Sequence, residues 1–225
     1  MNKNLLIFDI DDTVTKSEFQ HQSSFIDAMK ALGIHKINQN WSEYDHMTDT
    51  YILKCNFENN LDAEFNKEFI SKFENKMMGF MTQLSEVSEI PGSTAFVEKI
   101  YNHDSYDYCF ATGSLSNPAL LKLKQAGIRH QEEIVVGSND YLSREEIVDA
   151  AISRAKQFYN VVEYERIISF GDGLWDLKTA EKLGLHFVGL GEKHKEIFKQ
   201  KGVKIMLLDW TNFKIEDLEN AFGIN

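Results

Sequence analysis

The feature that most constrains the fold is a regular alternation of short apolar segments with amphipathic helical ones after Pro91-Gly92. This alternation predicts a parallel sheet with helices on both faces, because parallel strands are joined by crossovers that run over the sheet as helices. A buried-strand pattern at 4–10, rich in Leu and Ile, joins the same sheet. Helices are expected at 93–102, 118–126, 144–158 and 175–183, with a further helix that ends at 201 and a last one near 216–222. Strands are expected at 106–111, 134–136, 167–170, 185–190 and 203–208.

Residues 17–89, which follow the first strand, have no convincing strand pattern and indicate helices at 18–32, 42–55 and 62–87. The last of these has apolar residues at steps of four or three, which form one face that packs into a core: Phe65, Phe69, Phe73, Met77, Met81 and Leu84. We therefore predict the α/β class, with a doubly wound, Rossmann-like parallel sheet (1–16 and 90–225). An all-helical cap (17–89) is inserted after its first strand.

Composition excludes several classes of protein. The 225 residues are 43% hydrophobic and 26% charged, as in an ordinary globular protein. A net charge of −11 disfavours nucleic acid and anionic membranes as partners. Cys55 and Cys109 are far apart and form no metal-binding or redox motif. The apolar run at the N-terminus is too short for a signal peptide, so we expect a soluble, cytoplasmic protein.

Polar runs directly follow three of the predicted strands: DIDDT at 9–13, TGS at 112–114 and GDGLWD at 171–176. Each run alone is consistent with a turn or a helix cap. In a doubly wound sheet, however, the carboxyl ends of the strands meet where ligands bind. Carboxylates gathered there repel one another unless a cation lies between them, and oxygen ligands of this kind suit Mg²⁺.

With these three runs the sequence resembles the haloacid dehalogenase superfamily of phosphotransferases, including its phosphatase and β-phosphoglucomutase-like members with a helical cap. The superfamily motifs DxDxT, strand-Thr and GDxxxD match 8–14, 111–113 and 171–176. This sequence departs from the superfamily pattern at a further motif, which is usually a lysine. The corresponding segment, 143–146, reads SREE, and we assign the role of this lysine to Arg144. Lys122 and Lys124 are alternatives, although solvation on a helix surface is the simpler expectation for both.

The resemblance implies that Asp9 attacks phosphorus and that Asp11 is the general acid and base. It implies that Thr112, the Gly113 amide and Arg144 bind the phosphoryl group. The metal ligands would be the Asp9 side chain, the Asp11 backbone carbonyl and Asp172, with Asp176 outside them or paired with the cation. Asp11 favours phosphomonoester or phosphomutase chemistry, because dehalogenases and phosphonatases of the superfamily generally lack this second aspartate.

The cap segment has six lysines, twelve acidic residues and no arginine between Ser17 and Glu89. Since arginine would most naturally grip a second anionic group, we predict a small metabolite with one phosphate and a neutral or cationic remainder, such as a sugar, polyol or nucleoside monophosphate. His21 could contact this substrate or be a solvated surface histidine. The leading hypothesis is a Mg²⁺-dependent phosphatase; the alternatives are a sugar-phosphate mutase and a non-catalytic phosphate-binding module.

Overall fold

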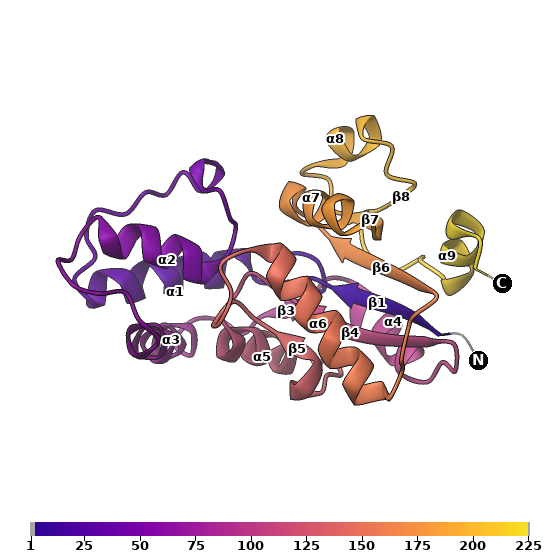
Figure 1. Ribbon diagram of the computed structural model, residues 1–225, viewed down its shortest axis with the longest axis horizontal. Coiled ribbons are helices and arrows are strands. Elements are labelled where there is room, and N and C mark those ends of the chain that lie inside the picture. The colour runs from indigo at the N-terminus through magenta and orange to yellow at the C-terminus, as the bar shows by residue number, and fades with distance from the viewer. Residues whose placement is uncertain (1–2, 225) are drawn as a thin grey trace.

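A six-stranded parallel sheet forms the centre of the molecule in the computed structural model, which describes residues 3–224 (Figure 1). Its order is β5-β4-β1-β6-β7-β8, and this confirms the predicted doubly wound sheet. The central strand pairs with neighbours on both sides, so that Phe8 lies opposite both Phe110 and Phe170. The strands are β1 (Asn4–Phe8), β4 (Tyr106–Ala111), β5 (Val135–Val136), β6 (Arg166–Gly171), β7 (His186–Leu190) and β8 (Ile205–Leu207).

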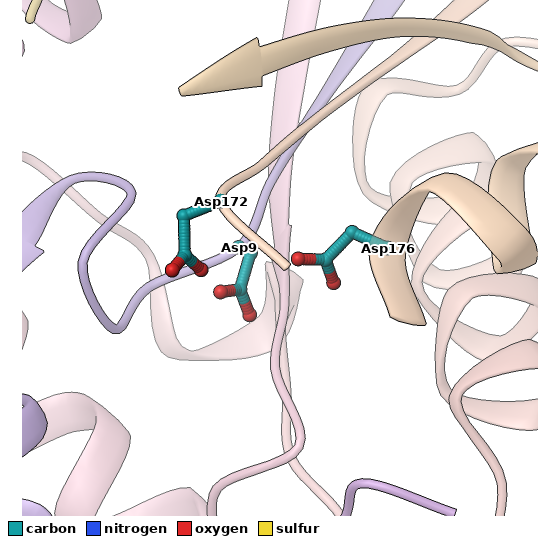
Figure 2. Close-up of side chains that lie close together, drawn as sticks. All are labelled: Asp9, Asp172 and Asp176. Carbon is teal, nitrogen blue, oxygen red and sulfur yellow. The ribbon is translucent and has the colours of Figure 1, made fainter. Parts of the chain in front are cut away.

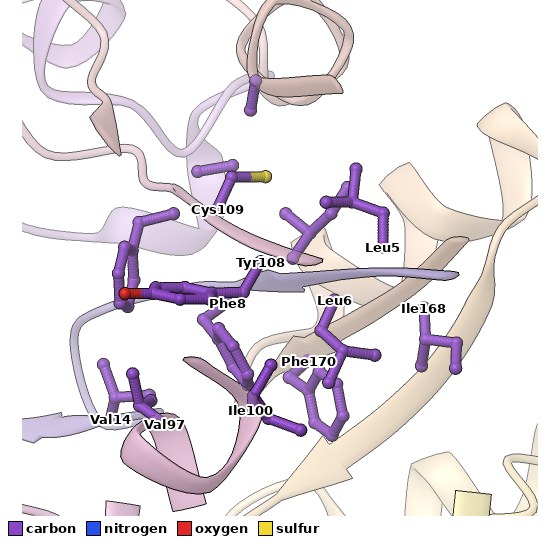
Figure 3. Packing of buried hydrophobic residues seen from close by; sticks show 14 of the residues in the cluster. Leu5, Leu6, Phe8, Val14, Val97, Ile100, Tyr108, Cys109, Ile168 and Phe170 are labelled. Atoms are coloured by element: carbon purple, nitrogen blue, oxygen red, sulfur yellow. The ribbon is translucent and has the colours of Figure 1, made fainter. Parts of the chain in front are cut away.

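Helices pack on both faces of this sheet because its strands are apolar on both sides. Figure 3 shows Leu5 and Cys109 on one side of β1 and β4, and Leu6 and Phe170 on the other. Within residues 3–224, no helix combines the length and the apolar character needed to cross a bilayer. The helices outside the insertion are α4 (Ser93–Tyr101), α5 (Ser116–Gln125), α6 (Arg144–Tyr159), α7 (Leu174–Leu183), α8 (Lys195–Gln200) and α9 (Ile215–Phe222).

The segment between β1 and α4 is a helical insertion that lies at one end of the molecule (Figure 1). It contains α1 (Glu18–Ala31), the short 3₁₀ turn η1 (Trp41–Glu43), α2 (Asp49–Glu58) and α3 (Lys67–Met81). The chain enters it through β2 (Thr15–Lys16) and leaves it through β3 (Ser88–Glu89), which pair with each other in an antiparallel fashion. Strands of two residues are too short to leave a periodic pattern, so the sequence did not indicate them.

Two of the predicted helices in this insertion are shorter than expected. The helix predicted at 42–55 begins only at Asp49, because the Thr48 side chain accepts a hydrogen bond from the Tyr51 amide and caps the helix there. The helix predicted at 62–87 covers only Lys67–Met81, and the Asn66 side chain caps its start by accepting from the Phe69 amide at 3.0 Å. Apolar periodicity thus extended beyond the helix starts that these polar caps impose, while at the other end α2 continues to Glu58 and α3 stops at Met81.

The insertion has its own apolar core. Phe25, Phe73 and Met77 are buried there, and the rings of Phe25 and Phe73 meet edge to face with centroids 5.0 Å apart. Leu115, from the loop that follows β4, is completely buried in the same cluster. Because this leucine belongs to the sheet-bearing part of the chain, the insertion is held directly against the loop that carries the TGS run.

Candidate active site

The three polar runs meet at the carboxyl ends of β1, β4 and β6, beneath the helical insertion. A cavity of about 550 Å³ opens there. The TGS and GDGLWD runs contribute to its lining together with the acidic run after β1, although they are far apart in the sequence. The predicted site residues that line it are Asp9, Asp11, Thr112, Gly113, Arg144, Asp172 and His21. The sheet registers place all three strand ends at one edge, which is why these residues converge.

Three carboxylates crowd together in this site (Figure 2). Asp9, Asp172 and Asp176 each have an oxygen within 4.8 Å of the others. Burial raises the pKa of Asp9 to about 7, against the opposing attraction of Arg144. Burial, followed by repulsion from Asp176 and Asp9, raises the pKa of Asp172 to about 9. Such raised values show that the cluster favours additional positive charge, and its oxygen donors fit Mg²⁺.

Arg144 supplies one positive charge to this cluster. Its guanidinium is buried and donates to Asp9 Oδ1 at 2.9 Å and to Asp176 Oδ1. The other Asp176 oxygen accepts from the Gly173 amide at 3.0 Å, so both oxygens of Asp176 bind protein donors. Asp9 and Asp172 line the cavity, whereas Asp176 does not. The arrangement places Asp176 as a partner of the arginine and leaves Asp9 and Asp172 facing the space where a cation would bind.

The first residue of α6 is this arginine, and local sequence fixes where the helix starts. The Ser143 hydroxyl accepts from the Glu146 amide, and the Glu146 carboxylate accepts from the Ser143 amide. This reciprocal cap satisfies two backbone donors and sets the direction in which the first residue projects. The Arg144 side chain therefore leaves the helix start directly into the cavity.

The loop after β4 is shaped by close contacts with the insertion. The Thr112 hydroxyl accepts from the Ser114 amide at 3.1 Å, and the Gly113 carbonyl accepts from the Asp49 amide at 2.7 Å. A Cβ on residue 113 would lie 2.4 Å from the Met47 carbonyl oxygen. Only glycine allows the insertion to approach this closely.

Asp11 is held apart from the other carboxylates by a buried lysine. Lys122 Nζ donates to Asp11 Oδ1 and Oδ2 at 2.7 and 2.6 Å, and Ser17 Oγ donates to Oδ1 at 2.5 Å. Burial alone would raise the pKa of Asp11, but the Lys122 ammonium, followed by His21 and the Ser17 hydroxyl, outweighs burial and lowers this pKa to about 2. Asp11 is therefore a carboxylate in this arrangement.

The expectation that Lys122 is solvated on a helix surface is wrong, because its side chain is completely buried. Lys124, two residues further on, is exposed as expected. The sequence did contain a signal: Lys122 follows Pro118 by four residues, and both lie on the buried face of α5 with Ala119 and Leu123.

His21 is not a freely solvated histidine. Its Nδ1 lies 3.0 Å from Lys122 Nζ, and its Nε2 lies 2.9 Å from Asp49 Oδ1. Asp49 is itself buried and accepts from the Leu115 amide at 2.9 Å. Lys122 was weighed only as an alternative to Arg144, and the residues near the site that sequence reasoning did not assign to it include Ser17, Tyr44, Lys178, Lys193 and His194.

Comparison with known proteins agrees with this geometry. The family model described as haloacid dehalogenase-like hydrolase matches residues 6–190. The chain therefore belongs to the haloacid dehalogenase-like hydrolase family. Comparison with curated proteins yields no match.

Solved structures share the fold at low sequence identity. A haloacid dehalogenase hydrolase from Entamoeba histolytica superposes with a TM-score of 0.71 at 14% identity, covering 99% of this chain and 100% of that one. CbbY from Rhodobacter sphaeroides, solved in complex with phosphate, superposes with a TM-score of 0.67 at 16% identity, covering 94% of this chain and 96% of that one. A putative β-phosphoglucomutase from Bacteroides vulgatus superposes with a TM-score of 0.65 at 15% identity, covering 99% of this chain and 90% of that one. These likenesses establish the fold.

Proposed function

We propose that this protein is a Mg²⁺-dependent phosphomonoester hydrolase that works through an aspartyl-phosphate intermediate. The observation that carries the proposal is the arrangement around Asp9. Its carboxylate lies in the cavity beside Asp172, and Arg144 contacts it at 2.9 Å. A nucleophilic carboxylate next to a fixed guanidinium and a cation site provides the alignment and positive charge that phosphoryl transfer requires.

The reaction divides into two steps at Asp9. In the first, an oxygen of the Asp9 carboxylate bonds to phosphorus while the bond from phosphorus to the leaving oxygen breaks, and Asp11 protonates that oxygen. In the second, Asp11 takes a proton from water, the water oxygen bonds to phosphorus, and the bond to Asp9 breaks. Asp11 is ionised in the resting arrangement and so is ready for the second step. For the first step Asp11 must carry a proton: an ester bound as its monoanion would supply it, and the negative charge of the phosphate would raise the pKa of Asp11 so that the carboxylate accepts it.

Thr112, the Gly113 amide and Arg144 would bind the phosphoryl oxygens. Bound Mg²⁺ would be held by the Asp9 side chain, the Asp11 backbone carbonyl and Asp172, and would supply positive charge beside those oxygens. The pairing of Asp176 with Arg144 and the Gly173 amide supports its place outside the direct ligands. Asp176 then serves to hold the guanidinium in position.

The substrate would be a small metabolite with one phosphate and a neutral or cationic remainder. The insertion lines the cavity with Glu18, Asp45 and Asp49, beside the aromatic rings of Trp41 and Tyr44. An anionic group facing this wall would be repelled, whereas a hydroxylated or aromatic group could pack against it. The cavity lysines, Lys178 and Lys193, belong to the sheet-bearing part of the chain and not to the insertion, and Lys193 Nζ donates to Glu18 of the insertion at 3.2 Å.

The test of this function uses p-nitrophenyl phosphate, then a panel of phosphorylated metabolites, with Mg²⁺ and with a chelator. Asp9→Asn should abolish turnover while leaving the protein folded, because the amide keeps the volume and loses the nucleophile. The matched control is Asp27→Asn, at an exposed carboxylate of α1, which should behave like wild type. Full activity in Asp9→Asn would refute the mechanism, and a strong preference for bisphosphates would refute the substrate class.

A sugar-phosphate mutase on the same fold is the second candidate, since one structural neighbour is described as a putative β-phosphoglucomutase. A mutase would return the phosphoryl group from Asp9 to a bound sugar phosphate and would have to hold a bisphosphate intermediate. The insertion of this chain has no arginine for the second phosphate, which favours hydrolysis. Incubation with a hexose 1-phosphate separates the two: release of inorganic phosphate supports the phosphatase, and formation of an isomer supports the mutase.

A further inference from the structure

Lys122 is a charged side chain with no exposed surface, and such a residue is costly unless its partners are well placed. Besides the two oxygens of Asp11, its ammonium contacts Ser114 Oγ at 3.1 Å and His21 Nδ1 at 3.0 Å. These partners come from the loop after β1, the loop after β4 and helix α1. The ammonium is therefore held from several directions, and its position is determined by the tertiary structure around it.

The partners of Lys122 define a hydrogen-bond chain with a single direction. An ammonium can only donate, so His21 Nδ1 must be an acceptor and the ring proton must be on Nε2. That proton is directed to Asp49 Oδ1 at 2.9 Å, and Asp49 Oδ2 accepts from the Leu115 amide at 2.9 Å. His21 and Asp49 belong to the insertion, so the insertion helps to hold the lysine in place beside Asp11.

We propose that Lys122 is the positioning residue for Asp11: it grips both carboxylate oxygens and, braced by His21 and Asp49, fixes the orientation from which Asp11 exchanges protons with the leaving group and water. The assignment rests on the proposed phosphatase function. Lys122 does not line the cavity, whereas Asp11 does, so the lysine acts through the aspartate and not on the substrate. Arg144 contacts the nucleophile Asp9 and not Asp11. The two buried cations therefore have separate tasks.

The experiment measures kcat/KM of wild type and Lys122→Met on p-nitrophenyl phosphate and phenyl phosphate. The two esters differ little in size, but phenoxide is the poorer leaving group and depends more on protonation. Because kcat/KM reports only the steps up to the first phosphoryl transfer, hydrolysis of the intermediate does not enter the comparison. We expect kcat/KM on phenyl phosphate to fall at least about tenfold more than on p-nitrophenyl phosphate, within the range that general acid catalysis supplies.

Lys124→Met is the matched control, because it removes the same charge from an exposed position on the same helix; it should leave both values unchanged. If Lys122→Met does not fold, His21→Gln weakens the brace and should shift the ratio of the two kcat/KM values in the same direction by less. Equal losses on both esters, or a ratio that stays constant or moves toward phenyl phosphate, would overturn the positioning role. Absence of Mg²⁺-dependent turnover of either ester by wild type would refute the phosphatase function itself, and this assignment with it.

Discussion

Replacing Asp172 with asparagine should stabilise the protein when no divalent metal is present. The change keeps the shape of the side chain and removes one of the clustered charges. Two unit charges 4.8 Å apart repel by about 3.5 kcal/mol at an effective dielectric constant of about 20. At pH 8 the folded wild type avoids most of this repulsion by holding Asp172 protonated, and folding then has to include the uptake of that proton; asparagine needs none, so we expect a gain of about 2 kcal/mol at pH 8. For a chain of this length that corresponds to a rise of roughly 4–8 °C in Tm.

The pH dependence of this gain has a defined sign. The folded-state pKa of Asp172 is raised from 3.8 to about 9, so the native protein binds more protons than the unfolded chain between these values. Stability of the wild type must then fall as pH rises through this window. Asp172→Asn removes the part of this dependence that comes from residue 172, and its advantage over wild type should therefore grow between pH 5 and pH 9.

Thermal unfolding in a chelator, and then in excess Mg²⁺, measures both effects. Magnesium should stabilise the wild type by about 2.7 kcal/mol when its concentration is about one hundred times Kd, and should do little for Asp172→Asn. Asp27→Asn, at an exposed position, controls for the general effect of charge removal. The reasoning is wrong if Asp172→Asn is less stable than wild type in chelator at pH 8, or if Mg²⁺ stabilises both proteins equally.

Two further substitutions test other contacts of the site. Gly113→Ala places a methyl group against the Met47 carbonyl. The substitution should lower kcat/KM about tenfold or more and reduce the free energy of unfolding by about 1–3 kcal/mol. Unchanged steady-state kinetics would argue against close docking of the insertion. Arg144→Met leaves Asp9 and Asp176 without their cation and should cost about 3–5 kcal/mol in chemical denaturation at pH 8. The loss should be smaller at pH 5, where Asp9, with a pKa of about 7, takes up a proton; an equal loss at both pH values would contradict this assignment of charge.

The extent to which sequence predicted this protein differs between its two parts. Strand 106–111 was predicted with the bounds of β4, and the start of α6 at Arg144 was predicted as well. In the insertion, helix ends were misplaced because they depend on single hydrogen bonds, such as those made by Thr48 and Asn66, that apolar periodicity does not detect. The places of the acidic motifs followed from the strand ends, whereas their chemical roles stay predictions.

What the sequence determined by itself was the alternation of strands and helices and the polar runs after three strands, because these depend on local periodicity and on the common edge of parallel strands. The tertiary structure alone decided that Lys122 is buried against Asp11 and that Arg144 joins Asp9 to Asp176. A lysine or arginine side chain is normally exposed to solvent. Its charge can be buried only where acceptors from distant segments of the chain offset the cost of desolvation.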